Sequence, residues 1–321
     1  MQVNMVGAIN NALDIILREN DKAVLLGEDI GKDGGVFRVT DGLQAKYGEN
    51  RVMDTPLAES AIIGTSIGMA LMGMHPIPEI QFAGFMYLAY DQLVSHAARY
   101  RTRTRSAFQI PMTVRTPVSG GVKALEHHSE SPEALYAHPG GLIVIEPSTP
   151  YDAKGLLIKA CRTNDPVLFL EPTRLYRLFK QDIPEDAYEI PIGKANVVEE
   201  GSDLTIITYG TMVTVVKDAV AKKNVSAEIL DLRTINPLDT EAILAAAKKT
   251  GKVMIVHEAE KSFGVGAEVA AMLAEKALYN LDAPIIRVAG PSMPYPFPGY
   301  EKYYTPNVAK VVQGIEKLLS Q

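Results

Sequence analysis

The sequence is poor in the features that several protein classes require. Its single cysteine, Cys161, excludes a disulfide within the chain and a cysteine-based zinc site, and it fits a reducing compartment. No run of about 18 apolar residues occurs, so we expect no membrane span. The N-terminal stretch MQVNMVGAINNALDII lacks the basic start and continuous apolar core of a signal peptide. These absences predict a cytoplasmic protein.

Basic residues are also fewer than acidic ones. Lys and Arg total 32 against 38 Asp and Glu, and this balance argues against a dedicated nucleic-acid binder. Four arginines alternate from Arg99 to Arg105 and could bind an anionic partner. Because the chain as a whole is acidic, a solvated or interfacial helix end is the favoured interpretation.

What the sequence does contain is an alternation of short aliphatic runs with longer stretches of helical periodicity. The runs are apolar nearly throughout, which is typical of parallel strands covered on both faces. In the first half they begin at Ala23, Arg51, Pro76, Pro111, Gly141 and Pro166. Helices are predicted between them at about 8–16, 58–72, 85–99 and 151–161. This order predicts an α/β fold with a parallel sheet.

The alternation stops after Glu171 and resumes near Asp203. The intervening stretch is charged, contains several prolines and has little periodicity, as an interdomain linker would. We therefore predict two α/β domains, at about 1–185 and 195–321. Strand-like runs and helices, among them predicted helices at 212–223 and 306–319, alternate again in the second domain.

Two local motifs leave alternatives open. The string GTSIG around Ser66 matches a nucleophile elbow, but it lies inside a small-residue segment better explained as one helix packed closely against a partner. Glu59, in the first turn of that helix, either stabilises the helix dipole or grips a base-like ligand at an interface. His128 is expected in a loop, with Ser131 as the N-cap of the next helix and Pro132 at its first position.

Six segments in one order along the chain resemble a single family. They are GEDIGKDGGVFRVTDGL from Gly27, DTPLAESAIIGTSIGMA from Asp54, EIQFAGFMYLAYDQLVSHAARYR from Glu79, HHSESPEALYAHPGG from His127, PVLFLEP from Pro166 and FGVGAEVA from Phe263. The family is the β subunits of the thiamine-diphosphate-dependent 2-oxo acid dehydrogenases, the decarboxylating component of the pyruvate and branched-chain complexes. The resemblance implies two α/β domains of transketolase type, a pyrimidine-binding domain followed by a transketolase C-terminal domain.

The resemblance also implies roles for five residues. Glu59 would hydrogen-bond the pyrimidine of thiamine diphosphate and activate it, and Glu28 would belong to a proton path between active sites. Leu57 and Phe85 would line the pyrimidine, and His128 would handle the 2-oxo acid or the lipoyl group. Some members hold a structural potassium ion, largely through backbone carbonyls. The matching residues are Met112, Ala160, Thr163 and Asp165, with Thr163 at a position where an acid is expected.

The Gly-Asp-Gly motif that binds magnesium and diphosphate in thiamine enzymes is absent, since KDGG and TDG lack its context. The resemblance therefore implies a heterotetramer of two α and two β subunits, in which the α subunit binds Mg²⁺ and shares the cofactor. The second domain would dock the dihydrolipoyl acyltransferase core. An acetoin dehydrogenase β subunit and a non-catalytic scaffold subunit are the alternatives, and the choice between pyruvate and branched-chain substrates stays open.

Overall fold

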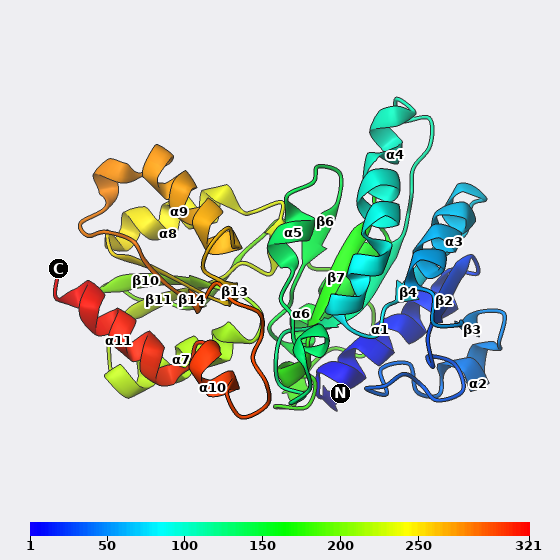
Figure 1. Ribbon diagram of the computed structural model, residues 1–321, viewed down its shortest axis with the longest axis horizontal. Helices are drawn as coiled ribbons and strands as arrows, with labels where there is room; N and C mark the ends of the chain where they lie inside the picture. Colours follow the sequence, from blue (N-terminus) through cyan, green and yellow to red (C-terminus); the bar gives the residue numbers. More distant parts are fainter.

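The computed structural model describes residues 1–321, which form two α/β halves side by side (Figure 1). The N-terminal half, blue to green, contains a seven-stranded sheet in the order β12-β6-β7-β5-β4-β2-β3. The C-terminal half, yellow-green to red, contains a five-stranded sheet in the order β14-β13-β10-β11-β9. None of the helices combines the length and apolarity needed to cross a membrane.

The seven-stranded sheet is parallel except for its edge strand β12, which runs antiparallel to β6. Its strands are β2 (Ala23–Gly27), β3 (Val52–Asp54), β4 (His75–Glu79), β5 (Thr113–Val118), β6 (Ile143–Ile145), β7 (Val167–Pro172) and β12 (Thr234–Asn236). The helices of this half are α1 (Met5–Glu19), α2 (Leu43–Tyr47), α3 (Glu59–Leu71), η1 (Ala83–Ala89), η2 (Asp91–Ala97), α4 (Ala98–Arg103), η3 (Glu126–His128), α5 (Glu133–Ala137), α6 (Pro150–Cys161) and η4 (Thr173–Leu175).

The sheet separates two hydrophobic cores. The neighbouring residues Leu25 and Leu26 of β2 point to opposite faces and belong to different cores. One core, of 27 buried residues, lies under α1 and α6, and the other, of 37, extends from α3 into the C-terminal half. Burial on both faces explains why these strands are apolar without alternation.

The five-stranded sheet is parallel except for β9, and helices cover both of its faces (Figure 1). Its strands are β9 (Asn196–Glu199), β10 (Leu204–Thr208), β11 (Ala227–Asp231), β13 (Val253–Glu260) and β14 (Ile286–Gly290). The helices are α7 (Met212–Lys223), α8 (Thr240–Thr250), α9 (Val265–Lys276), η5 (Leu278–Asn280), α10 (Glu301–Tyr304) and α11 (Val308–Leu319).

The structure departs from the predicted elements at three places. The single helix expected at 85–99 consists of the 3₁₀ helix η1, the π-helix η2 and the start of α4. The expected linker contains β9 and also β8 (Gln181–Asp182), which pairs with β1 (Gln2–Val3). Strand β12 comes from the C-terminal half but completes the first sheet. The boundaries 1–185 and 195–321 stay a prediction.

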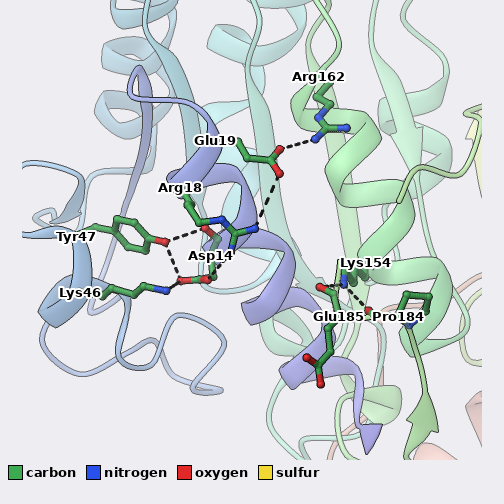
Figure 2. Close-up of polar contacts among 9 residues, drawn as sticks. All are labelled: Asp14, Arg18, Glu19, Lys46, Tyr47, Lys154, Arg162, Pro184 and Glu185. Atoms are coloured by element: carbon green, nitrogen blue, oxygen red, sulfur yellow. Dashed lines mark hydrogen bonds and ion pairs between the residues drawn. The ribbon is translucent and has the colours of Figure 1, made fainter. Parts of the chain in front are cut away.

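Polar contacts fasten α1 and α6, which pack side by side (Figure 2). Arg162 at the C-cap of α6 donates to Glu19 of α1 over 2.6 Å. Lys154 is buried within α6, and its ammonium donates to the carbonyl oxygens of Pro184 and Glu185 at 2.6 and 2.9 Å. Because these carbonyls satisfy the ammonium, the loop after β8 is held against the helix.

Buried carboxyl groups lie where the two halves meet. Tyr209, after β10, donates a 2.7 Å hydrogen bond to Glu133 of α5. Glu146, after β6, lies against Gly210, where a Cβ atom would come within 2.0 Å of its carboxyl oxygen, and the φ of this glycine is +54°. Burial, together with the charge of Glu258, raises the pKa of Glu133 to about 8. Burial and the charges of Glu133 and Glu258 raise the pKa of Glu146 well above its usual range.

The raised pKa values of Glu133 and Glu146 predict that the free energy of unfolding decreases as the pH rises. A carboxyl group with a raised pKa binds its proton more tightly in the folded chain than in the unfolded chain. Its stabilising contribution is therefore complete below about pH 4.5 and is lost as the pH rises toward about 8. We expect Glu146→Gln to flatten the fall of the unfolding temperature over this interval. Exposed Glu241→Gln is the control, and a parallel fall in both variants would contradict the prediction.

Candidate functional site

Four neighbouring parallel strands, β3, β2, β4 and β5, end at the same edge of the first sheet. The carboxyl ends of parallel strands are where α/β proteins bind ligands. Glu28 follows β2 directly, and Glu59 starts the helix that follows β3. Phe85 lies in η1 after β4, and His128 lies in η3 after β5. The predicted residues therefore follow four adjacent strand ends.

Two buried carboxyl groups form one part of this edge. Glu59 is the first residue of α3, 9% exposed, in a helix without a side-chain cap. The free amide groups of a helix N-terminus favour a carboxylate there. Glu28 is 3% exposed, and its Oε1 atom has no hydrogen-bond partner. Burial, together with the charges of Glu59 and Asp29, raises the pKa of Glu28 to about 7.

A cluster of three aromatic rings forms the other part of this sheet edge. The ring of His128 lies 4.4 Å from that of Phe82 and 5.3 Å from that of Phe85, edge to face in both pairs. The turn of η3 rests on Gly84, where a Cβ atom would lie 2.4 Å from the carbonyl oxygen of His127. Glycine is therefore needed for this close approach. The Nδ1 atom of His128 is buried and has no partner.

Hydrogen bonds connect the carboxyl and aromatic parts. Gln81, which precedes Phe82, donates to Asp29, which follows Glu28, over 3.0 Å. The hydroxyl of Ser60, next to Glu59, donates to the carbonyl oxygen of Leu88 at the end of η1. The structure thus brings the strand ends of β2, β3 and β4 together.

Leu57 does not pack against the buried carboxyl groups or the aromatic cluster. It precedes α3 and is 79% exposed, and Leu88 nearby in η1 is 62% exposed. Two cavities of the chain, of about 670 and 460 Å³, are lined by other residues. The predicted residues therefore form an open edge of the sheet, with apolar side chains facing outward beside it.

The loop that holds His128 differs from prediction at its end. Helix α5 begins at Glu133 and has Pro132 as its N-cap, without a side-chain cap. The expected N-cap, Ser131, donates instead to the hydroxyl of Ser119 over 3.3 Å. The prediction of Ser131 as N-cap was wrong because this bond ties the loop back to the end of β5.

The sequence prediction missed a buried ionic cluster below the edge. Arg115 of β5 donates to Glu79 of β4 over 2.8 Å and to Glu171 of β7 over 2.7 Å. Tyr176 donates to the second oxygen of Glu171 over 2.7 Å. The signal in the sequence is a charged residue in each of three segments predicted to be buried strands, because buried charges require partners. The residue Phe82 was missed as well.

The four residues of the expected potassium site lie around the end of α6. The carbonyl oxygen of Met112 accepts from the amide of Val167 at 2.9 Å, and that of Ala160 accepts from the amide of Thr163 at 3.0 Å. The Thr163 hydroxyl donates to the carbonyl oxygen of Lys159. Asp165 accepts from the guanidinium of Arg101 over 2.5 Å. Each residue thus has an oxygen that is already hydrogen-bonded.

Comparisons with known proteins agree with this architecture. Residues 1–178 match the family model of the transketolase pyrimidine binding domain, and residues 193–311 match that of the transketolase C-terminal domain. In a solved structure of a split-gene transketolase, described as an inactive beta4 tetramer, the fold is the same, with a TM-score of 0.80 at 22% identity over 99% of this chain and 98% of that one. The predicted fold class of two transketolase-type α/β domains is confirmed.

Relatives match over nearly the full length of the chain. It is 51% identical to the pyruvate dehydrogenase E1 component subunit beta of Acholeplasma laidlawii over 319 residues, 98% of each chain. It is 47% identical to the subunit of the same name from Bacillus subtilis, over 99% of each chain. The 2-oxoisovalerate dehydrogenase subunit beta of B. subtilis is 49% identical over 98% of each. The chain therefore belongs to the family of 2-oxo acid dehydrogenase β subunits, as its motifs predicted.

Proposed function

We propose that this chain is the β subunit of an enzyme that decarboxylates a 2-oxo acid on thiamine diphosphate. The acyl group would then pass to the lipoyl group of a dihydrolipoyl acyltransferase core, in the cytoplasm. The observation that supports this best is that buried Glu59 and Glu28 are close enough for their charges to interact, at the same sheet edge to which β5 leads His128. Relatives with this full-length match include subunits named for both pyruvate and 2-oxoisovalerate dehydrogenases.

The residues at the edge fit the pyrimidine half of the cofactor. Glu28 and His128 each have a buried polar atom without a partner, as expected where a ligand completes the hydrogen bonding. Glu59 would hold the ring nitrogen, and Phe85 and Leu57 would contact the faces of the ring. When bound, thiamine diphosphate supplies the electron sink that lets carbon dioxide leave.

The chain's own residues would transfer protons, exclude water and orient the substrate. The carboxyl group of Glu59 is buried, so its hydrogen bond to the pyrimidine would be stronger than the same bond in water. The pKa of Glu28, about 7, lets this side chain take up or release a proton near neutral pH. The ring of His128, which packs edge to face against Phe82 and Phe85, would orient the 2-oxo acid or the lipoyl group.

The site would be completed by an α subunit that binds Mg²⁺ and the diphosphate. The exposed apolar side chains beside the edge, Leu57 and Leu88 among them, support a protein partner there, because such patches mark interaction surfaces. We propose a heterotetramer of two α and two β subunits.

The test is reconstitution of the chain with its α subunit, thiamine diphosphate and Mg²⁺. Carbon dioxide release would be measured across pyruvate and branched-chain 2-oxo acids, and oxidation with acetoin. Turnover of a 2-oxo acid is the expected result and identifies the substrate. Activity on acetoin alone would favour an acetoin dehydrogenase subunit. An assembled complex that binds cofactor but is inactive on every substrate would leave the scaffold alternative.

Glu28 gives this function a pH signature. We expect the pH profile of kcat to show an ionisation near pH 7 that disappears in Glu28→Gln. Asp29→Asn is the matched variant, because Asp29 contributes to the raised pKa of Glu28 and its neutralisation should move the ionisation to lower pH. An unchanged profile in both variants would show that another group sets the pH dependence.

A further inference from the structure

The loop between β5 and α5, at 119–132, contains His128 and is bonded at its base to the C-terminal half of the chain. We propose that Glu258 of β13, paired with Arg174 of η4, is a positioning residue that holds His128 at the candidate site through this loop. The effect on catalysis rests on the proposed function, whereas the anchoring of the loop is a property of the chain alone.

The first observation is a buried carboxylate at the base of the loop. Glu258 is 5% exposed, and its Oε1 atom accepts a 2.9 Å hydrogen bond from the amide of Gly120, 138 residues earlier in the chain. Its Oε2 atom accepts from the guanidinium of Arg174. Thr173 donates to the carbonyl oxygens of Ser119 and Gly120 at 3.2 and 3.1 Å. Groups from β13 and η4 therefore hold the start of the loop, and hydrogen bonds to charged groups are the strong ones.

The second observation is how closely the loop fits these side chains. A Cβ atom at Gly120 would lie 2.0 Å from the hydroxyl oxygen of Tyr295, in the segment after β14. One at Gly121, whose φ is +131°, would lie 2.3 Å from the Cγ atom of Arg174. Glycine is needed at both positions, because any other side chain would displace these neighbours. The path of the loop at its base is thus determined by side chains of η4 and the C-terminal half.

The third observation is that little else holds the loop before it reaches η3. Exposed and half-buried residues alternate at 121–125, and no backbone amide there donates to a backbone carbonyl. Beyond this stretch, η3 rests on Gly84, and the ring of His128 packs in the aromatic cluster. The returning chain closes on the same base, since the amide of Ser119 donates to the carbonyl oxygen of Glu130 over 3.0 Å. Without the bond to Glu258, we expect the loop to open locally and His128 to leave its position more often.

The first test is amide hydrogen exchange of the full chain, measured by mass spectrometry on peptides that cover 119–131. Glu258→Ala should speed exchange in this segment about tenfold or more, because it removes a hydrogen bond to a charged group. Glu258→Gln should recover part of the protection, since its amide oxygen can still accept from Gly120.

The matched control is Glu228→Ala. Glu228 is also a buried, ion-paired carboxylate of the C-terminal half, but its partner is Lys249. Exchange at 119–131 should stay unchanged in this variant. The proposal would be overturned by unchanged exchange in Glu258→Ala, or by an equal increase in Glu228→Ala, because the loop would then not depend on Glu258.

The second test is a double-mutant cycle between Glu258→Ala and His128→Ala in the enzyme reconstituted with the α subunit. Glu258→Ala should lower kcat/KM by about 10- to 100-fold, as expected for a misplaced group. The double variant should be no slower than His128→Ala, because a residue that acts by positioning His128 has no effect once that ring is gone. The rate of the unaltered complex tests the proposed function by itself, so losses that multiply in the double variant would overturn only the positioning role.

Discussion

Replacing Glu59 by Gln should lower kcat of the reconstituted enzyme by about 10²- to 10⁴-fold, the usual contribution of a positioned acid or base. The substitution keeps the shape of the side chain but replaces the carboxyl group by an amide, which cannot exchange a proton with the pyrimidine. Glu59 is 9% exposed at the start of α3, so water cannot easily replace the lost carboxyl group. Carbon dioxide release from a 2-oxo acid, measured with the α subunit at saturating cofactor, is the direct measurement.

The control for this variant separates chemistry from folding. Glu59→Gln should assemble with the α subunit as the unaltered chain does, because the amide still occupies the helix start. Size-exclusion chromatography and the unfolding temperature report this. Exposed Glu49→Gln, in the same half of the chain, should retain full activity. A rate near that of the unaltered enzyme in Glu59→Gln would remove this residue from the proposed site.

Replacing Arg115 by Met should destabilise the chain by about 3–5 kcal/mol, the cost of breaking a buried ion pair from one side. Arg115 is 2% exposed and is bonded to both Glu79 and Glu171. Methionine fills much of the same volume, but it leaves two buried carboxyl groups without their cation. Urea-induced unfolding at neutral pH measures the loss, and surface Arg18→Met, 57% exposed, should stay close to the unaltered chain.

Two further measurements show whether the uncompensated buried carboxylates cause the loss of stability in Arg115→Met. Burial already raises the pKa of Glu79, so protonation at acidic pH removes part of the uncompensated charge in the variant. The loss of stability should therefore shrink as the pH falls. Adding Glu79→Gln and Glu171→Gln to Arg115→Met should recover part of the stability, since the buried charges are then gone. A loss that is independent of pH and of these substitutions would indicate a packing defect instead.

The sequence alone predicted the strands that are buried along their whole length. The runs at Ala23 and Pro166 are strands because both faces of the sheet are covered. The position of Glu59 at a helix start was also predictable, because the small-residue helix begins there. The roles of Glu28 and His128 required the family resemblance, since isolated acids and histidines have no distinctive local pattern.

Contacts between distant segments explain what could not be predicted. Strand β12 has three residues, and only its pairing with Val144 and Ile145 makes it a strand. The segment at 85–99 has helical periodicity, but its hydrogen bonding changes type along its length. Phe82 and His128 are more than 40 residues apart in the sequence, and they meet only because of the path that the loop after β5 takes. Hydrophobic periodicity does not predict the path of a loop.

The crossing of β12 into the first sheet constrains how this chain folds during its synthesis. Strand β6 gains its outer neighbour only when Thr234–Asn236 have been made, long after the rest of that sheet. Until then the nascent chain has an uncovered strand edge, the kind of edge that invites pairing with other chains. A fragment ending near residue 185 would keep that edge permanently, so the N-terminal half is not a freely exchangeable module.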